Sequence, residues 1–369
     1  MKSKIVLSLF VAGALFTSCS SDDESSSSPT LNIPTEYISV DFDANVVAEN
    51  TVINELSTVT SALNAAESNA QSLTVDLIAY PTTLSAVTLP NYRTLVTEWL
   101  VQLVNSANSV DRFQNPGFGN MPVMGQEGGL LGTRLLDEYG LELEQMVEKG
   151  SFGSALYNHA LTVINGDLTD AGVIDKLVEI HGTDITFNPS STTSAATYSR
   201  RRSNLLAETG FFFDIKNNLI TAKAAIEAGS EFNAIRDEAL SDFLMNWEMS
   251  NFATVIYYCN ATKDLLTAAF ALADGPDKDV ALGNAMHAYA EGVAFAHGFK
   301  GLSDKMITDT QIDSVLANFL AVEGLNPESH RFLNEVALFS NLDTVIGDLQ
   351  NIYGFTDAEI TSFYVNNNP

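Results

Sequence analysis

The chain has 369 residues, and its 46 acidic side chains against 18 basic ones give a formal net charge of -28. So acidic a protein is not expected to bind nucleic acid or to adsorb electrostatically to anionic lipid. Hydrophobic residues make up 46% of the chain, which is ample for a large core and excludes an acidic disordered protein. We therefore expect a globular protein with no nucleic acid among its partners.

The start of the chain has the features of a secretory signal. A basic start precedes an apolar stretch, residues 5–16, that is too short to span a bilayer. The small residues of "FTSC" end at Cys19, which looks like a bacterial lipoprotein signal. We predict that residues 1–18 are removed as a signal peptide and that Cys19 is lipidated. Cys259 is then the only other cysteine, which excludes a disulfide framework and a cysteine zinc site.

Residues 19–34 include "SSDDESSSSPT", which lacks the apolar side chains that could order it, and we expect a flexible tether. A serine followed by acidic residues just after the lipidated cysteine resembles the surface-export signal of Bacteroidetes lipoproteins. The resemblance implies a protein that a lipid anchor holds to the outer membrane and that is exposed on the cell surface. A lipoprotein that faces the periplasm is the alternative.

The rest of the chain, residues 35–369, is predicted to be a single helical domain. "EYISVDF", residues 36–42, alternates like a strand, but it has no obvious partner and we expect an extended lead-in. Apolar residues then recur at helical spacing. They include Ile53, Leu56, Val59 and Leu63, and after Pro90 also Tyr92, Leu95, Val96, Trp99, Leu100, Leu103 and Val104. The stretch from 231 to about 270 has no glycine or proline and could form one helix of about 60 Å. The predicted fold class is all-α, a multi-helix bundle with long central helices and a short extended N-terminal segment.

Residues that begin and end helices support this pattern. Glycines at 150, 166, 182, 229 and 301 are predicted to end helices in left-handed C-caps. Pro327 is predicted at a first helical position, and "TDAE" at 356–359 is a capping box.

Two segments interrupt the helical pattern. Residues 115–132 are rich in glycine, carry two prolines and are predicted to be a long irregular surface loop, since a P-loop's lysine and spacing are missing. Residues 187–204 are predicted to be a serine- and threonine-rich loop that ends in Arg200, Arg201 and Arg202. In a polyanion such arginines most often lie against acidic helix surfaces. A carboxylate or phosphate clamp, or a protease-sensitive site, is the alternative.

Motifs of common enzymes are missing. The chain has no HExxH, no GxSxG and no GxGxxG followed by a suitable acid, and His159, His181 and His330 are isolated. His181 precedes a helix-ending glycine, where a cation would favour the helix dipole, so we expect a structural role. Some enzymes carry no local motif, and the sequence leaves catalysis open, with a non-enzyme favoured.

Residues 281–299 form the most informative stretch. Its only ionisable side chains are His287, Glu291 and His297, and a helix that is apolar all round is a buried central helix. His287 and Glu291 are four residues apart and share a face, whereas His297 points about 80° away from His287. A buried carboxylate must be paired or protonated, so Glu291 needs a partner.

The partner is His287, a basic residue from elsewhere, or a metal such as iron or zinc. Glu248 and Asn251 lie within an apolar stripe of the long helix and are predicted to extend the pair into one polar network across two central helices. A structural network is favoured over a metal or ligand site formed by His287 and Glu291, because buried polar groups usually bond only one another.

Several stretches resemble a Bacteroidetes lipoprotein family defined by the domain of unknown function numbered four-eight-five-six. They are "ISVDFDANVVAENTVINELSTV", "GLLGTRLLDEYGLELEQMVEKGSFGSALYNHAL", "WEMSNFATVIYY" and "HAYAEGVAFAHGF". The resemblance begins near residue 35 and implies an all-helical fold with no assigned activity. The family commonly has "HHWDEAFGYFG" near 190–215, where this chain reads "YSRRRSNLLAETGFFFD", which puts a function of those histidines in doubt.

More distantly, the arrangement is similar to imelysin-type proteins, helical proteins tied to iron acquisition that carry a Gly-x-His-x-x-Glu motif. Here Gly283, His287 and Glu291 have a different spacing.

Three functions remain open. The favoured one is a surface-anchored, non-catalytic binding lipoprotein that serves acquisition of iron or another small ligand, with an outer-membrane receptor as a possible partner. The alternatives are an imelysin-like metal-dependent peptidase or hydrolase, and a structural or assembly component of the outer membrane.

Overall fold

A computed structural model describes residues 29–72, 74–109, 112–123 and 125–369. Residues Leu31–Pro369 form one compact unit. The expected signal peptide, Cys19 and most of the expected tether lie outside the described residues.

The described residues fold as an all-α helical bundle, as the helical periodicity predicted. The α-helices in chain order are α1 (Phe42–Asn45), α2 (Val47–Ser68), α3 (Thr82–Val87), α4 (Pro90–Asn108), α5 (Leu143–Ser151), α6 (Asn158–Ile164), α7 (Gly172–His181), α8 (Ser194–Arg201), α9 (Phe211–Ala228), α10 (Asn233–Phe270), α11 (Pro276–His297), α12 (Asp309–Asn318), α13 (Phe339–Tyr353) and α14 (Asp357–Phe363). A π-helix, η1 (Phe152–Tyr157), joins α5 to α6, so this part of the chain is one continuous helical rod.

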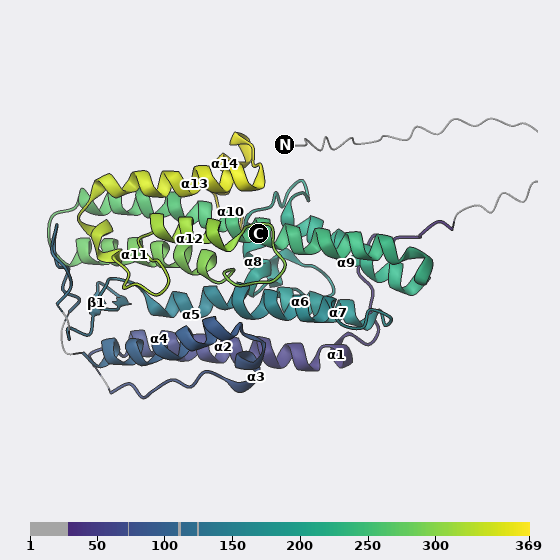
Figure 1. Cartoon of the computed structure of the whole chain (residues 1–369), viewed down its shortest axis with the longest axis horizontal. Coiled ribbons are helices and arrows are strands. Elements are labelled where there is room, and N and C mark those ends of the chain that lie inside the picture. The colour runs from purple at the N-terminus through teal and green to yellow at the C-terminus, as the bar shows by residue number, and fades with distance from the viewer. Residues whose placement is uncertain (1–28, 73, 110–111, 124) are drawn as a thin grey trace, which may run out of the picture. The chain divides into compact units, whose positions relative to one another are not determined.

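The helices stack in layers within this unit (Figure 1). Helix α10 has 38 residues, as the run without glycine or proline predicted, and it packs against α9, α11 and α13. Helix α11 in turn packs against α5, and α5 packs against α2 and α4. Two layers therefore cover each side of α11, which explains why its sequence is apolar almost all round.

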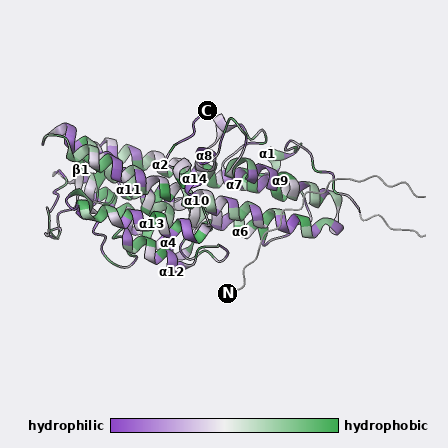
Figure 2. Ribbon diagram, turned by 90° about the horizontal axis from the view of Figure 1, so that it is seen from above, coloured by the Kyte–Doolittle hydropathy of each residue, from purple (hydrophilic) through white to green (hydrophobic). Residues whose placement is uncertain are grey.

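The outer helices keep one polar face. Hydrophilic and hydrophobic residues alternate along their ribbons in Figure 2. In α2 the buried side chains recur at three- or four-residue spacing, namely Val52, Leu56, Val59 and Leu63. In α4, Pro90 occupies the first turn and Tyr92, Val96, Leu100 and Leu103 are buried. Periodicity alone thus identified the buried face of both helices.

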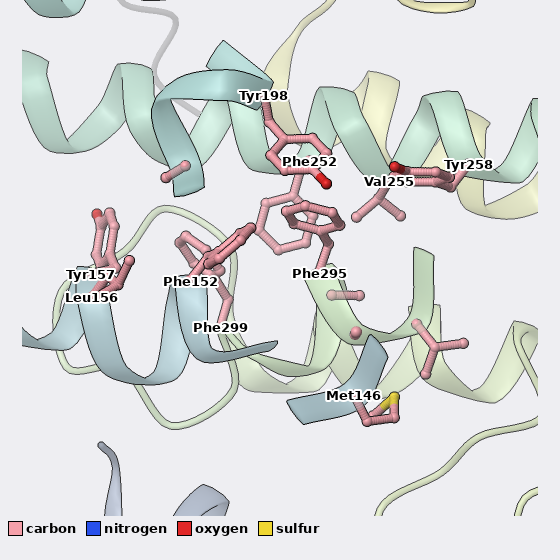
Figure 3. Close-up of a cluster of buried hydrophobic side chains, with 14 of the residues drawn as sticks. Met146, Phe152, Leu156, Tyr157, Tyr198, Phe252, Val255, Tyr258, Phe295 and Phe299 are labelled. Carbon is pink, nitrogen blue, oxygen red and sulfur yellow. The ribbon is translucent and has the colours of Figure 1, made fainter. Parts of the chain in front are cut away.

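Aromatic rings from four elements meet in the core (Figure 3). Phe295 of α11 lies 4.7 Å from Tyr198 of α8 and 5.9 Å from Phe152 of η1, measured between ring centroids. Phe252 of α10 and Phe299 are 5.4 Å apart. Edge and tilted contacts of this kind stabilise by about 1 kcal/mol each beyond the area that they bury.

Gly150 does not end a helix in the left-handed C-cap that the sequence predicted. Gly150 lies inside the rod that α5 and η1 form, and it has no positive φ. A Cβ atom on Gly153 would lie 2.7 Å from the backbone of Gly298, and one on Gly298 would collide with the carbonyl oxygen of Gly150. These glycines therefore let α5 and the end of α11 approach closely, which a sequence pattern cannot distinguish from a C-cap.

Other predicted helix ends have mixed outcomes. Gly182 has φ of 100° and caps α7, and the Thr356–Glu359 capping box is present at α14. Pro327 does not begin an α-helix, because residues 326–328 are irregular and only a 3-10 turn, Ser329–Leu333, follows.

The N-terminal lead-in, residues 36–42, forms no strand, as expected. Its buried side, however, is opposite to the side on which the apolar residues alternate. Ile38 and Val40 are exposed, whereas Tyr37 is buried. The Tyr37 hydroxyl donates a 2.5 Å hydrogen bond to Asp175 of α7, which also accepts from Ser39 at 2.7 Å. The lead-in is therefore held by a buried carboxylate and not by an apolar stripe.

Both segments predicted to be irregular contain regular structure. Within 115–132, the last residues form strand β1 (Gly129–Leu131), which pairs antiparallel with β2 (Arg134–Leu136) through a turn at Gly132. Within 187–204, a 3-10 turn (Pro189–Ser191) leads into α8. The prediction of loops throughout was wrong, because tertiary packing of α8 against α9 and α10 outweighs the weak helix propensity of serine and threonine.

Candidate functional site

The histidine and glutamate that the sequence singled out lie side by side on α11. The Nε2 atom of His287 is 3.8 Å from Oε2 of Glu291. The closer partner is Glu142, which directly precedes α5 and is fully buried, and its Oε2 atom lies 2.8 Å from Nδ1 of His287. Sequence spacing predicted the contact along the helix, but it could not indicate a glutamate that is 145 residues away.

Two cations flank these residues. The Nη1 atom of Arg134 in β2 is 3.6 Å from Oε1 of Glu142 and 3.6 Å from Oε1 of Glu67. The buried Lys149 of α5 places its Nζ atom 3.8 Å from Oε1 of Glu291. Each of these carboxyl groups therefore already has a protein cation beside it.

Burial shifts the histidine and its nearest partner in opposite directions. Burial, together with repulsion from Glu67, raises the pKa of Glu142 well above its usual range. Burial also lowers the pKa of His287. Both shifts favour the neutral form, so the contact between them is a hydrogen bond and not an ion pair. The contact gives Oε2 of Glu142 and Nδ1 of His287 a partner, which is a structural role, whereas the buried Oε1 of Glu142 has no hydrogen-bond partner in the described structure.

A metal ion would meet an unfavourable environment here. Across the described ranges, no group of three or more His, Cys, Asp or Glu side chains is arranged to hold a metal ion. Lys149 and Arg134 would also repel a cation placed between His287 and Glu291. Iron or zinc at this position stays a prediction that no coordination geometry among these residues supports.

The predicted extension of the pair through the long helix was wrong. Glu248 accepts hydrogen bonds from the backbone N–H groups of Met306 at 2.7 Å and Ile307 at 2.8 Å, and from the Tyr353 hydroxyl at 2.7 Å. Asn251 donates to a backbone carbonyl of α11 at 3.0 Å. The apolar stripe put both residues correctly in the core, but Glu248 binds the 306–307 backbone and α13, and not the pair on α11.

The three arginines are not on an exposed loop. Arg200 and Arg201 end α8 and Arg202 follows it, and Arg200 and Arg202 are only 6% and 5% exposed. Their guanidinium groups donate to the segment 363–368 near the end of the chain. The predicted loop and the predicted contact with acidic helix surfaces were both wrong, because a segment that is distant in sequence, and that offers amide oxygens, covers Arg200 and Arg202.

A more open site lies between α4 and the end of α11. Two pockets of about 310 Å³ and about 90 Å³ share Leu95, His297 and Glu323 in their linings. Tyr92 lines the larger pocket and Trp99 the smaller one. We refer to the two pockets together as the His297 groove.

The His297 ring packs against two aromatic rings of α4 that also contact each other. Its ring centroid is 5.3 Å from that of Tyr92 and 5.9 Å from that of Trp99. Its Nε2 atom is 3.5 Å from Oε2 of Glu323, which Nζ of Lys300 also approaches at 2.9 Å. The histidine contact and Lys300 lower the pKa of Glu323 to about 2, so this carboxylate is ionised at neutral pH.

The second nitrogen of the His297 ring has no partner. His297 is only 4% exposed, and its Nδ1 atom makes no hydrogen bond within the described structure. A buried polar atom without a partner costs about 1–3 kcal/mol, and a ligand gains that energy when the side chains that cover the atom move aside to admit it. Helical spacing predicts that His297 points away from His287, but only the folded chain places Trp99 and Glu323 beside it.

A serine and histidine also meet in the core without forming a reactive site. The Nε2 atom of His181 is 3.1 Å from the Ser199 hydroxyl, which lies 2.9 Å from that of Ser250. None of these side chains is more than 1% exposed, so no substrate reaches the hydroxyl groups.

No helix in the described part of the chain is long and apolar enough to cross a membrane. Comparison with known proteins finds no family, no curated protein and no solved structure that matches this chain.

Proposed function

We propose that this protein is a non-catalytic, lipid-anchored binding protein of the outer membrane that takes a small organic ligand into the His297 groove. The observation that carries the proposal is the unpartnered Nδ1 atom of a buried histidine where two pockets meet. The lipoprotein leader of the sequence supports the location, and an exposed anchored protein is suited to capture a small ligand for uptake through a receptor.

The arrangement of the groove selects the chemistry of the ligand. Ionised Glu323 faces Nε2 of His297, so whenever the ring is neutral its proton lies on Nε2 and Nδ1 is an acceptor. A ligand that satisfies it must donate an O–H or N–H group. Trp99 and Leu95 offer apolar surface beside it, which suits an aromatic or other apolar body. Catechol-type iron chelators have this combination, and they are the ligands expected here if the groove serves iron acquisition.

Phenol and anisole test the proposal, because they share a ring and only phenol donates a hydrogen bond. We expect phenol to bind in ligand-detected NMR titrations about tenfold more tightly than anisole, which is the effect of one hydrogen bond worth about 1.4 kcal/mol. His297→Phe keeps the ring packing and removes Nδ1, so it should abolish the preference. Trp99→Ala should weaken the binding of both.

His159→Phe is the matched control, because that histidine contacts Glu49 and lines neither pocket of the groove. It should leave the preference for phenol unchanged. Equal binding of the two ligands by the wild type, or an unchanged preference in His297→Phe, would contradict the proposal.

A further inference from the structure

Arg200 and Arg202 are buried without an acidic partner, although the chain has 46 acidic residues. Among the described residues, no carboxylate lies within 4 Å of the guanidinium nitrogens of the three arginines. Burial lowers the pKa of Arg202 to about 10, and no carboxylate offsets that effect. A charged group this deep usually has a counter-ion, because desolvation disfavours an isolated charge.

Neutral groups of the segment 363–368 occupy the place of that counter-ion. Nη1 of Arg200 donates to the carbonyl oxygen of Asn367 at 3.0 Å and to Oδ1 of Asn368 at 3.4 Å. Arg202 donates from Nη1 to the carbonyl oxygen of Phe363 and from Nη2 to Oδ1 of Asn366. All four acceptors are amide oxygens, which are weaker partners for guanidinium than a charged oxygen.

The two guanidinium groups still have donors to offer. Their Nε atoms are buried and have no hydrogen-bond partner in the described structure. The Arg202 guanidinium also lies 4.5 Å from the centre of the Tyr257 ring, which fixes its plane from one side. Planar donors of this kind match the paired oxygens of a carboxylate or phosphate.

We propose that Arg200 and Arg202 form a binding site for an oxyanion, a phosphate or carboxylate group, and that the segment 364–369 is a displaceable cover over it. The anion takes the place of the amide oxygens of Asn366, Asn367 and Asn368. This segment carries no acidic residue and half of it is asparagine, so it satisfies the arginines without neutralising them. The Phe363 carbonyl belongs to the end of α14 and stays in place.

The backbone of the cover offers a direct readout. The Asn367 N–H group donates to the carbonyl oxygen of Arg201 at 3.2 Å, and this hydrogen bond breaks when the cover leaves. Hydrogen exchange of the full chain, with inorganic phosphate and acetate as separate probes and chloride at matched ionic strength, measures that opening. We expect phosphate or acetate to increase exchange across 364–369 while exchange across 198–203 stays slow.

Three substitutions make the experiment specific. Arg202→Gln removes a donor fork, and we expect at least a tenfold loss of affinity for the anion and no opening of the cover. Asn366→Ala removes a competing acceptor and should tighten binding several-fold, because less of the cover has to be displaced. Arg93→Gln on the exposed face of α4 is the matched control and should change neither quantity.

The outcomes separate this site from a purely structural role. Arginines that only cap the end of α14 would give no anion-dependent exchange in 364–369, and that result would overturn the proposal. Anion binding of equal strength in the wild type and in Arg202→Gln would overturn it as well. A response to phosphate alone or to acetate alone supports the site and identifies which oxyanion it accepts.

Discussion

At the scale of single residues, His181 shows how burial decides a protonation state. The ring is completely buried, packs 5.0 Å from the Trp247 ring and contacts the Ser199 hydroxyl. Desolvation lowers its pKa from 6.5 to about 3. The expected structural role fits this position, but the expected cation at the end of α7 does not, because the ring stays neutral at physiological pH.

This neutral histidine makes the fold sensitive to acid. Between pH 6.5 and 3 the unfolded chain binds a proton at this site and the folded chain does not, so stability falls as pH decreases. The loss amounts to about 1.4 kcal/mol per pH unit below the unfolded pKa, or about 2 kcal/mol by pH 5. Urea unfolding at several pH values should show this slope in the wild type. His181→Gln should be less stable at pH 7 and should have a flatter slope, and equal slopes would contradict the assignment.

The polar residues of α10 and α11 show the reach and the limit of a helical pattern. Spacing of four residues predicted the contact between His287 and Glu291, because residues one turn apart share a face. It could not predict Glu142, Arg134 or Lys149, since each comes from another element. A local pattern thus identified buried polar groups but not their partners.

At the scale of elements, α8 places Arg200 and Arg201 in a helix, where the sequence predicted a loop. Its sequence, "SAATYSRR", follows a serine- and threonine-rich stretch and reads locally as a loop. Docking against α9 and α10 makes it helical and places Arg200 and Arg202 under the segment 364–369. Peptide bonds in a docked helix are poor protease substrates, because cleavage requires local unfolding.

Limited digestion with trypsin tests this arrangement. Arg112 is the better substrate, because its side chain is 55% exposed and an irregular stretch follows it. We expect the first cut after Arg112 and protection of the bonds at 200–202, as mass spectrometry of the fragments would show. Arg112→Gln should remove the early fragments without exposing α8. An early cut at 200–202 in the wild type would contradict this arrangement and would show that these residues lie on an exposed loop.

At the scale of the whole molecule, the leader and the acidic composition bear on location. The expected signal peptide and Cys19 lie outside the described residues, so the prediction of lipidation rests on "FTSC" and the serine and acidic residues after it. A formal charge of -28 disfavours electrostatic attachment to an anionic surface, which makes a covalent lipid the more effective anchor.

Replacement of Cys19, the residue predicted to be lipidated, tests the anchor. Cys19→Ala should yield unprocessed or soluble protein in membrane fractionation, because the lipid can no longer be attached. Proteinase treatment of intact cells should remove the wild type if it is exposed on the surface. A wild type that resists digestion in intact cells, but not in lysed ones, would place it on the periplasmic side of the outer membrane.

The sequence by itself determined the helical class, the long helix α10 and the buried faces of α2 and α4. Hydrophobic periodicity is a local property of the sequence, and in a long helix it fixes which face is buried whatever element packs against that face. It also identified the stretch 281–299, most of which lies in α11, as part of a central helix, because the ionisable residues of that stretch are so few.

The tertiary structure alone decided which distant groups meet. Gly150 belongs to a close helix contact and not to a C-cap, Glu142 and not Glu248 binds His287, and Trp99 and Glu323 surround His297. Each of these contacts joins elements far apart in sequence, where no periodicity relates one residue to the other. Partner choice depends on how the layers stack, and that follows from the packing of the whole core.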